Sequence, residues 1–96
     1  MSHGYAKDKD ALIKRLHRIE GQVRGIERMV EGDRYCIDIL TQIAAVRTAL
    51  EHVGARLLED HVNHCVAGAI RSGDDAAVAH KTTELLEAVQ RFVKTR

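Results

Sequence analysis

Residues 12–30 carry a regular hydrophobic pattern that restricts the fold of this chain more strongly than any other segment. The aliphatic positions follow one another at intervals of four, three, four, three and four residues: Leu12, Leu16, Ile19, Val23, Ile26 and Val30. This spacing places them along one side of an α-helix that packs lengthwise against another helix. The chain contains no proline, the residue that breaks helices most strongly. The sequence therefore predicts long, uninterrupted helices.

A second and a third helix follow from the positions of the helix breakers. Gly32 ends the first periodic segment, and from Cys36 to about Arg71 nothing stronger than a single glycine interrupts the helical pattern. Residues 72–75 (SGDD) then end this helix and cap a third. The apolar side of the third helix consists of six residues: Val78, Leu85, Leu86, Val89, Phe92 and Val93. No segment has the alternating pattern of a strand. We predict an all-α fold of three helices, with the central one longest.

Length and composition predict one domain without a membrane segment. A chain of 96 residues with 45% hydrophobic content fits a single domain spanning residues 1–96, in which residues 1–6 are expected to be mobile. Charged residues make up 30% of the chain, and no apolar run approaches the roughly 18–20 residues that cross a bilayer. No apolar stretch of a secretory signal follows the first residue. The expected location is therefore the cytoplasm, with no membrane partner.

The predicted second helix is too long for one small domain to cover. About 35 residues at about 1.5 Å each make a rod of about 50 Å. The aliphatic core of a chain with so few aromatic residues is small and gives limited stability. An antiparallel helical dimer, or a larger assembly, would bury the remaining apolar stripe. The alternative is a monomeric three-helix bundle with a kinked second helix.

Cys36, His61 and Cys65 are the candidate metal ligands. Two cysteines are too few for a disulfide framework, which favours metal or redox chemistry for both. His61 and Cys65 are four residues apart and share one helix face, although this pair alone also fits a buried cysteine beside a hydrogen-bonded histidine. Cys36 lies about 37 Å from His61 along a continuous helix, so the two cannot bind one ion within a chain. In an antiparallel dimer, Cys36 of one subunit can lie beside His61 and Cys65 of the other.

The donor types leave more than one metal open. Two thiolates and one imidazole suit Cu(I), which accepts three-coordinate soft sites. Zn(II) would need a fourth ligand, for which His64 is the candidate, and square-planar Ni(II) would need one that His3 could supply. The remaining histidines, His17, His52 and His80, stand among charged or polar neighbours and are interpreted as surface residues.

Basic residues are concentrated in the first helix. Five positions share one helical stripe of cations separated by glycines: Lys14, Arg18, Gly21, Gly25 and Arg28. The missing side chains would let a nucleic-acid backbone approach between the cations, and an assembly multiplies the number of charges presented. The alternative is a solvated face whose glycines serve close helix packing. In the first interpretation, four residues are the predicted DNA contacts: Lys14, Arg15, Arg18 and Arg47.

Three stretches of the sequence resemble one family. They are residues 15–26 (RLHRIEGQVRGI), residues 35–46 (YCIDILTQIAAV) and residues 61–65 (HVNHC). Together they are similar to the CsoR/RcnR family of metal-responsive transcriptional repressors, and most similar to its copper-sensing CsoR branch. The resemblance extends from about residue 7 to about residue 94.

The resemblance implies an all-helical antiparallel dimer that pairs into a dimer of dimers. Such proteins bind operator DNA in the metal-free state and release it when metal binds. Carried onto this chain, Cys36 of one protomer would bind Cu(I) together with His61 and Cys65 of the other. Tyr35 and Glu84 would form hydrogen bonds around the histidine, with Lys81 and Glu87 as alternatives to Glu84 about one turn away.

Some positions depart from the family pattern. His52 stands where some copper sensors carry a DNA-binding arginine, and His3 resembles an N-terminal histidine of nickel or cobalt sensors. Cys65 favours copper over those metals, and His61 argues against the persulfide-sensing branch. The sequence therefore predicts a Cu(I)-responsive repressor and not an enzyme, because the donor set leaves no position open for a substrate. Alternatives are a Ni(II)/Co(II)-responsive or persulfide-responsive repressor, or a copper-handling or redox protein that uses Cys36 and Cys65 as a dithiol.

Overall fold

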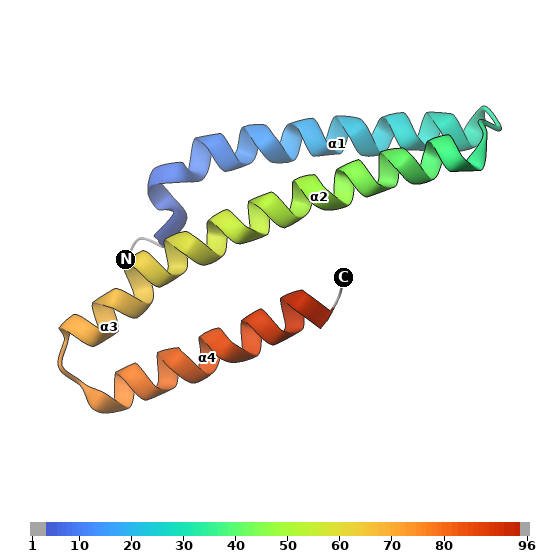
Figure 1. Ribbon diagram of the computed structural model, residues 1–96. Helices are drawn as coiled ribbons and strands as arrows, with labels where there is room; N and C mark the ends of the chain where they lie inside the picture. The colour runs from blue at the N-terminus through green and yellow to red at the C-terminus, as the bar shows by residue number, and fades with distance from the viewer. Residues whose placement is uncertain (1–3, 95–96) are drawn as a thin grey trace. The chain divides into compact units, whose positions relative to one another are not determined.

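The computed structural model describes residues 4–94 of the chain, and these residues are almost entirely helical (Figure 1). Six helical elements follow one another along the chain: the 3-10 helix η1 (Gly4–Asp8), α1 (Lys9–Glu31), α2 (Cys36–His61), the π-helical turn η2 (Val62–Val66), α3 (Ala67–Arg71) and α4 (Asp75–Lys94). α2, η2 and α3 are continuous and together make the predicted long second helix. No strand occurs among residues 4–94. The all-α prediction with a long central helix is confirmed.

The described residues form two compact units. One unit is Tyr5–Leu58, and the other contains Gly4 and residues 59–94. Residues 4–6 belong to η1, and residues 1–3 lie outside the described residues. The expected mobility of residues 1–6 stays a prediction, as does the single domain spanning residues 1–96. None of the helices within residues 4–94 combines the length and the hydropathy of a bilayer-spanning segment.

α1 and the part of α2 in the first unit pack side by side in opposite directions (Figure 1). The core that joins them is small and aliphatic, and it contains Leu12, Ile19, Val46 and Val53, with Ile26 and Ala49 packed against them. On each helix the buried residues are seven positions apart, which is the repeat of a lengthwise helix–helix seam. The hydrophobic spacing of α1 therefore predicted its packing correctly.

Along the hydrophobic stripe of α1 and that of α2, only every second position is buried in the single chain. The other members remain exposed and are also seven residues apart: Leu16, Val23 and Val30 on α1, and Ile43, Leu50 and Leu57 on α2. Two helices offer each other one face, so a wider apolar stripe needs a third helix to cover it. The hairpin consequently presents two rows of aliphatic side chains to its surroundings.

The first helix ends at Gly32, as predicted. Gly32 does not take the left-handed backbone conformation that a glycine often takes after a helix. The N–H of Gly32 donates to the carbonyl of Arg28 (2.9 Å), and that of Arg34 donates to Met29 (3.0 Å). Gly32 keeps a negative φ of −88°, whereas Asp33 has a φ of 53°. Aspartate tolerates this left-handed conformation better than most residues. The left-handed residue is therefore the aspartate after the glycine.

Asp8 connects the start of α1 to α2. Its side chain makes no capping bond to the first turn of α1. Instead its Oδ2 accepts hydrogen bonds from Nε (3.0 Å) and Nη2 (2.8 Å) of Arg56. Both side chains are partly exposed, so this pair contributes at most about 1 kcal/mol. Its main effect is to fix the ends of the two helices relative to each other.

In the second unit the chain turns at residues 72–74 and α4 doubles back. Gly73 takes a positive φ of 73°, and Oδ1 of Asp74 accepts hydrogen bonds from the N–H groups of Ala76 (3.0 Å) and Ala77 (3.3 Å). These are the predicted helix stop and the predicted N-cap of the last helix. α4 contacts α3 and η2.

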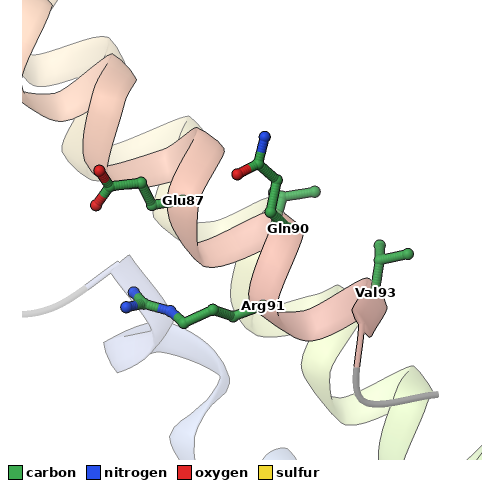
Figure 2. A pocket seen from close by; sticks show the side chains of 5 residues that line it. Glu87, Gln90, Arg91 and Val93 are labelled. Carbon is green, nitrogen blue, oxygen red and sulfur yellow. The ribbon is translucent and has the colours of Figure 1, made fainter.

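The C-terminal half of α4 carries exposed apolar side chains, those of Leu86, Phe92 and Val93. A hollow of about 680 Å³ runs along this half, lined by Glu87, Val89, Gln90, Arg91 and Val93. Figure 2 shows Glu87 and Arg91 leaving one side of the helix and Gln90 and Val93 leaving the other.

Candidate metal site and candidate nucleic-acid interface

The predicted metal ligands lie at the two ends of one helix. Cys36 is the first residue of α2, His61 is its last, and Cys65 follows in η2. At about 1.5 Å per residue, Cys36 and His61 are separated by about 37 Å along the helix axis. Both cysteines are free thiols; Cys36 is exposed and Cys65 is partly buried. Within residues 4–94, no three His, Cys, Asp or Glu side chains come together as a metal-binding group.

Cys65 lies in a turn that the sequence did not predict. The N–H of Ala67 donates to the carbonyl of Val62, five residues earlier, which is the hydrogen-bond pattern of a π-helix. Residues four apart stay close on such a turn, so His61 and Cys65 remain neighbours. The extra residue rotates everything after it by about 100° relative to a regular α-helix. π turns inside α-helices are frequent at functional sites.

Glu84 brings its carboxylate to the end of α2. Its Oε1 lies 3.8 Å from Nε2 of His61 and 3.7 Å from Nζ of Lys81, and its Oε2 lies 3.9 Å from Nε2 of His80. All four side chains are partly or largely exposed. The distance to His61 is slightly longer than a hydrogen bond. The structure therefore places the Glu84 carboxylate next to the histidine, although its role there stays a prediction.

The other predicted neighbours of the metal ligands are divided between the two ends of α2. Tyr35 is exposed and directly precedes Cys36, and its carbonyl accepts the N–H of Asp38 (3.1 Å). His64 is exposed in η2. A Cβ added to Gly4 would collide with the backbone of Asp60 and approach Cβ of His64 to 3.1 Å, so the chain at Gly4 lies against this turn. His3 lies outside the described residues.

Two of the predicted DNA contacts line a hollow between α1 and α2. The hollow has a volume of about 380 Å³, and its lining consists of Arg15, Arg18, Ile19, Gln22, Ala49 and His52. Lys14 and Arg47 are exposed but do not line it. The sequence pointed to His52 only through its match to a DNA-binding arginine of some copper sensors, and it did not point to Gln22. Arg15, Arg18 and Gln22 are three and four residues apart on α1, and Ala49 and His52 are three apart on α2, so each set lies on one face of its helix.

The glycines of the basic stripe face open space. A Cβ added to Gly21 or Gly25 would meet no atom within 4 Å. Close packing within the described chain therefore does not require a glycine at either position. Arg24, on the same helix, lies 3.5 Å from Glu20, so part of the positive charge of α1 is compensated.

Comparisons with known proteins assign the chain to a class. The family described as metal-sensitive transcriptional repressor matches residues 8–91. The chain belongs to this family, which consists of regulators and not of enzymes.

The similar proteins are transcriptional regulators whose names state the metal to which they respond. The chain is 53% identical to the copper-sensing transcriptional repressor CsoR of Bacillus subtilis, over 99% of this chain and 91% of the relative. The crystal structure of the copper-sensing repressor CsoR with Cu(I) from Geobacillus thermodenitrificans is 50% identical and superposes with a TM-score of 0.84, covering 92% of this chain and 88% of that one. The nickel-responsive transcriptional regulator InrS is 42% identical with a TM-score of 0.75, covering 86% and 90%. Proteins of this fold are therefore named for their responses to two different metals, copper and nickel.

Proposed function

We propose that this chain is a copper-sensing transcriptional repressor of the cytoplasm, which binds operator DNA in its metal-free form and releases it when Cu(I) binds. The observation that carries this proposal is the donor set. Two free thiols and one imidazole, those of Cys36, Cys65 and His61, occur in a chain that is 53% identical to a copper-sensing repressor. Soft thiolates and a nitrogen fit Cu(I), a soft ion that accepts three ligands.

The metal site is proposed to form between two subunits. Because α2 holds Cys36 and His61 at opposite ends, an antiparallel partner is needed to bring a Cys36 to His61 and Cys65. The exposed aliphatic rows of α1 and α2 support such a dimer, because a second copy of the hairpin would bury them. The open apolar residues of α4 offer a second surface on which two dimers could pair into a tetramer.

The donor set favours Cu(I) over the alternatives. Square-planar Ni(II) needs four donors, of which Cys36, His61 and Cys65 supply three, and the candidate fourth, His3, lies outside the described residues. A persulfide sensor needs the two thiols but has no use for the imidazole of His61. A redox dithiol within one chain is incompatible with the distance between Cys36 and Cys65 along the helix, and it leaves the basic hollow without a role.

DNA would bind to the basic surface of the hairpin. Arg15 and Arg18 line one hollow, and Lys14 and Arg47 are exposed on the same two helices. Neutralisation of phosphates by lysine and arginine releases counterions and supplies most of the sequence-independent affinity for DNA. An assembly of two or four copies multiplies this surface without any new type of contact.

Glu84 is proposed to couple metal binding to DNA release. When one ring nitrogen of His61 is a metal ligand, the other can carry an N–H and donate it to a carboxylate. The Glu84 carboxylate is 3.8 Å away, and a small movement of α4 would close this hydrogen bond. Such coupling requires that metal and DNA favour different arrangements of the assembly, and the effect must be reciprocal.

The test is DNA binding with and without Cu(I) under reducing conditions. The probe is a labelled DNA duplex that the metal-free protein selects from a random-sequence pool. The expected result is tight binding that Cu(I) weakens, with the response lost in Cys36→Ala, His61→Ala and Cys65→Ala and retained in His64→Ala. X-ray absorption of the Cu(I) protein should detect sulfur ligands. A spectrum with only nitrogen and oxygen donors would contradict the assignment.

A further inference from the structure

The two oxygens of the Glu84 carboxylate have different surroundings. Oε1 is 3.8 Å from Nε2 of His61 and 3.7 Å from Nζ of Lys81, so one oxygen faces both of these groups. The other oxygen, Oε2, is 3.9 Å from Nε2 of His80. Each of these distances is longer than a direct hydrogen bond. The carboxylate therefore lies beside His61 without being bonded to it, and Lys81 contacts the same oxygen that a hydrogen bond from His61 would use.

Lys81 is the cation best placed to keep the carboxylate there. It precedes Glu84 by three residues on α4, so the two side chains lie on one face of the helix. A lysine carries its charge at neutral pH, whereas a histidine such as His80 is charged only when protonated. The side chain of Lys81 is also less exposed than that of His80, 37% against 74%. Solvent therefore screens the pair with Lys81 less than the pair with His80.

Glu84 has to be held in place for the metal response to be large. Its side chain is 45% exposed, and a glutamate that points into solvent loses conformational freedom when it accepts a hydrogen bond in one position. An ion pair that already keeps Oε1 beside Nε2 of His61 reduces this loss. The hydrogen bond from a metal-bound His61 then forms at a lower entropic cost.

We propose that Lys81 is a positioning residue for the metal response: its ammonium group holds Oε1 of Glu84 where His61 can donate to it once the metal is bound. The proposal rests on the proposed function, because it takes the hydrogen bond between His61 and Glu84 as the link between metal binding and DNA release. Lys81 is neither a metal ligand nor a DNA contact in this scheme. Its loss should reduce the response to Cu(I) while the affinities for Cu(I) and, without metal, for DNA stay nearly unchanged.

The experiment separates the charge of Lys81 from its contribution to the helix. Lys81→Met keeps the length and the helix propensity of the side chain but removes the charge, and Lys81→Arg keeps the charge. Arg71→Met is the matched control, because Arg71 is an exposed cation of α3 in the same compact unit and is not one of the groups that face Glu84. Glu84→Gln and the double variant Lys81→Met/Glu84→Gln complete a double-mutant cycle.

Three quantities are measured for each variant and for wild type. Chelator competition gives the Cu(I) affinity, and binding of the selected duplex is measured in the metal-free and in the Cu(I)-loaded protein under reducing conditions. The ratio of the two DNA affinities is the response. Thermal unfolding verifies the fold of each variant.

The expected result is a response that is about twofold smaller in Lys81→Met than in wild type for each metal site that responds, since an exposed pair at this spacing shifts an equilibrium by about that factor. Lys81→Arg and Arg71→Met should respond as wild type does. In the Glu84→Gln background, Lys81→Met should have no further effect, because the charge that Lys81 holds in place is absent. A purely structural role of Lys81 would give the same loss in both backgrounds.

The outcomes that overturn the role of Lys81 differ from those that overturn the proposed function. A full response of Lys81→Met, an equal loss in the Glu84→Gln background, or a Cu(I) affinity lowered by as much as the response would each remove this role and leave a copper-sensing repressor. A wild-type protein that binds the duplex equally well with and without Cu(I) would overturn both.

Discussion

The two compact units of this chain differ in packing and in the kind of chemistry they carry. The four buried core residues of the described chain lie in the hairpin Tyr5–Leu58, which also bears the basic hollow. The unit of residues 59–94 contains no residue buried to that degree, and it holds His61, Cys65 and the exposed cluster around Glu84. Elements that move in regulation are typically those with few buried contacts. We therefore expect the proposed DNA-binding surface to be the more rigid part and the end that holds His61 and Cys65 to be the more adjustable one, with Cys36 on the rigid part.

The largest expected effect is the loss of DNA affinity when the hollow loses its charge. Arg15→Ala/Arg18→Ala should weaken binding of the selected duplex by at least about tenfold and lower the salt slope, because two phosphate contacts disappear per subunit. Arg24→Ala is the matched control, since Arg24 lies on the same helix but is paired with Glu20. Fluorescence anisotropy at several salt concentrations measures both quantities. Equal losses in the control and the double variant would move the DNA surface away from the hollow.

The difference in packing is tested by one substitution at two positions. Val53 is 6% exposed in the hairpin core and Val93 is 56% exposed on α4. Val53→Ala should lower the free energy of unfolding by about 2 kcal/mol, because it leaves a cavity. Val93→Ala should change it by less than about 0.5 kcal/mol in a dimer that leaves this surface of α4 uncovered, and by more where two dimers pair on α4. Urea unfolding at a fixed protein concentration compares them. If Val93→Ala costs as much as Val53→Ala, α4 is as tightly packed in the assembly as the hairpin.

The sensing end is tested at Glu84. Glu84→Gln keeps the shape of the side chain but removes its charge, so Cu(I) affinity should change little while the coupling between metal and DNA falls by about 1 kcal/mol. Glu87→Gln is the control, because Glu87 lines the open hollow of α4. Chelator competition measures Cu(I) affinity, and DNA binding with and without Cu(I) gives the coupling. A fully responsive Glu84→Gln protein would show that the signal takes another route.

The smallest expected effect concerns the glycines of the basic stripe. Gly21→Ala and Gly25→Ala should each raise the free energy of unfolding by up to about 1 kcal/mol, because alanine favours the helix and meets no atom. If DNA approaches the helix closely at these positions, the same variants should bind the selected duplex more weakly. Destabilisation by either alanine would mean instead that a partner subunit packs against the glycine.

Much of the fold could be predicted because the local signals agree. The aliphatic spacing of α1 gave its core residues Leu12 and Ile19, and the breakers at Gly32 and Gly73 gave the helix ends. The π turn around Cys65 could not be predicted, because one shifted hydrogen bond leaves the hydrophobic pattern almost unchanged.

The candidate sites also differ in how far the sequence predicts them, because one depends on local spacing and the other on the register between two helices. The spacing of His61 and Cys65 is a local property of the chain, and the structure places them at the end of α2 and in the adjoining turn η2. The place of His52 beside Arg15 and Arg18 depends on the register of two helices, and the sequence of either helix alone does not contain it. His52 was interpreted as a surface histidine, and in the structure it is exposed and lines the hollow together with Arg15 and Arg18.

The central claim is that one Cu(I) site is built from both ends of α2 in two different subunits. The most direct measurement mixes a Cys36→Ala chain with a His61→Ala/Cys65→Ala chain, unfolds and refolds them together, and titrates Cu(I) into the complex with the selected duplex. Each variant alone should keep DNA bound at every Cu(I) concentration. The mixture should contain heterodimers with one complete site and should release DNA. A mixture as unresponsive as its components, beside a responsive wild type treated in the same way, would contradict the intersubunit site.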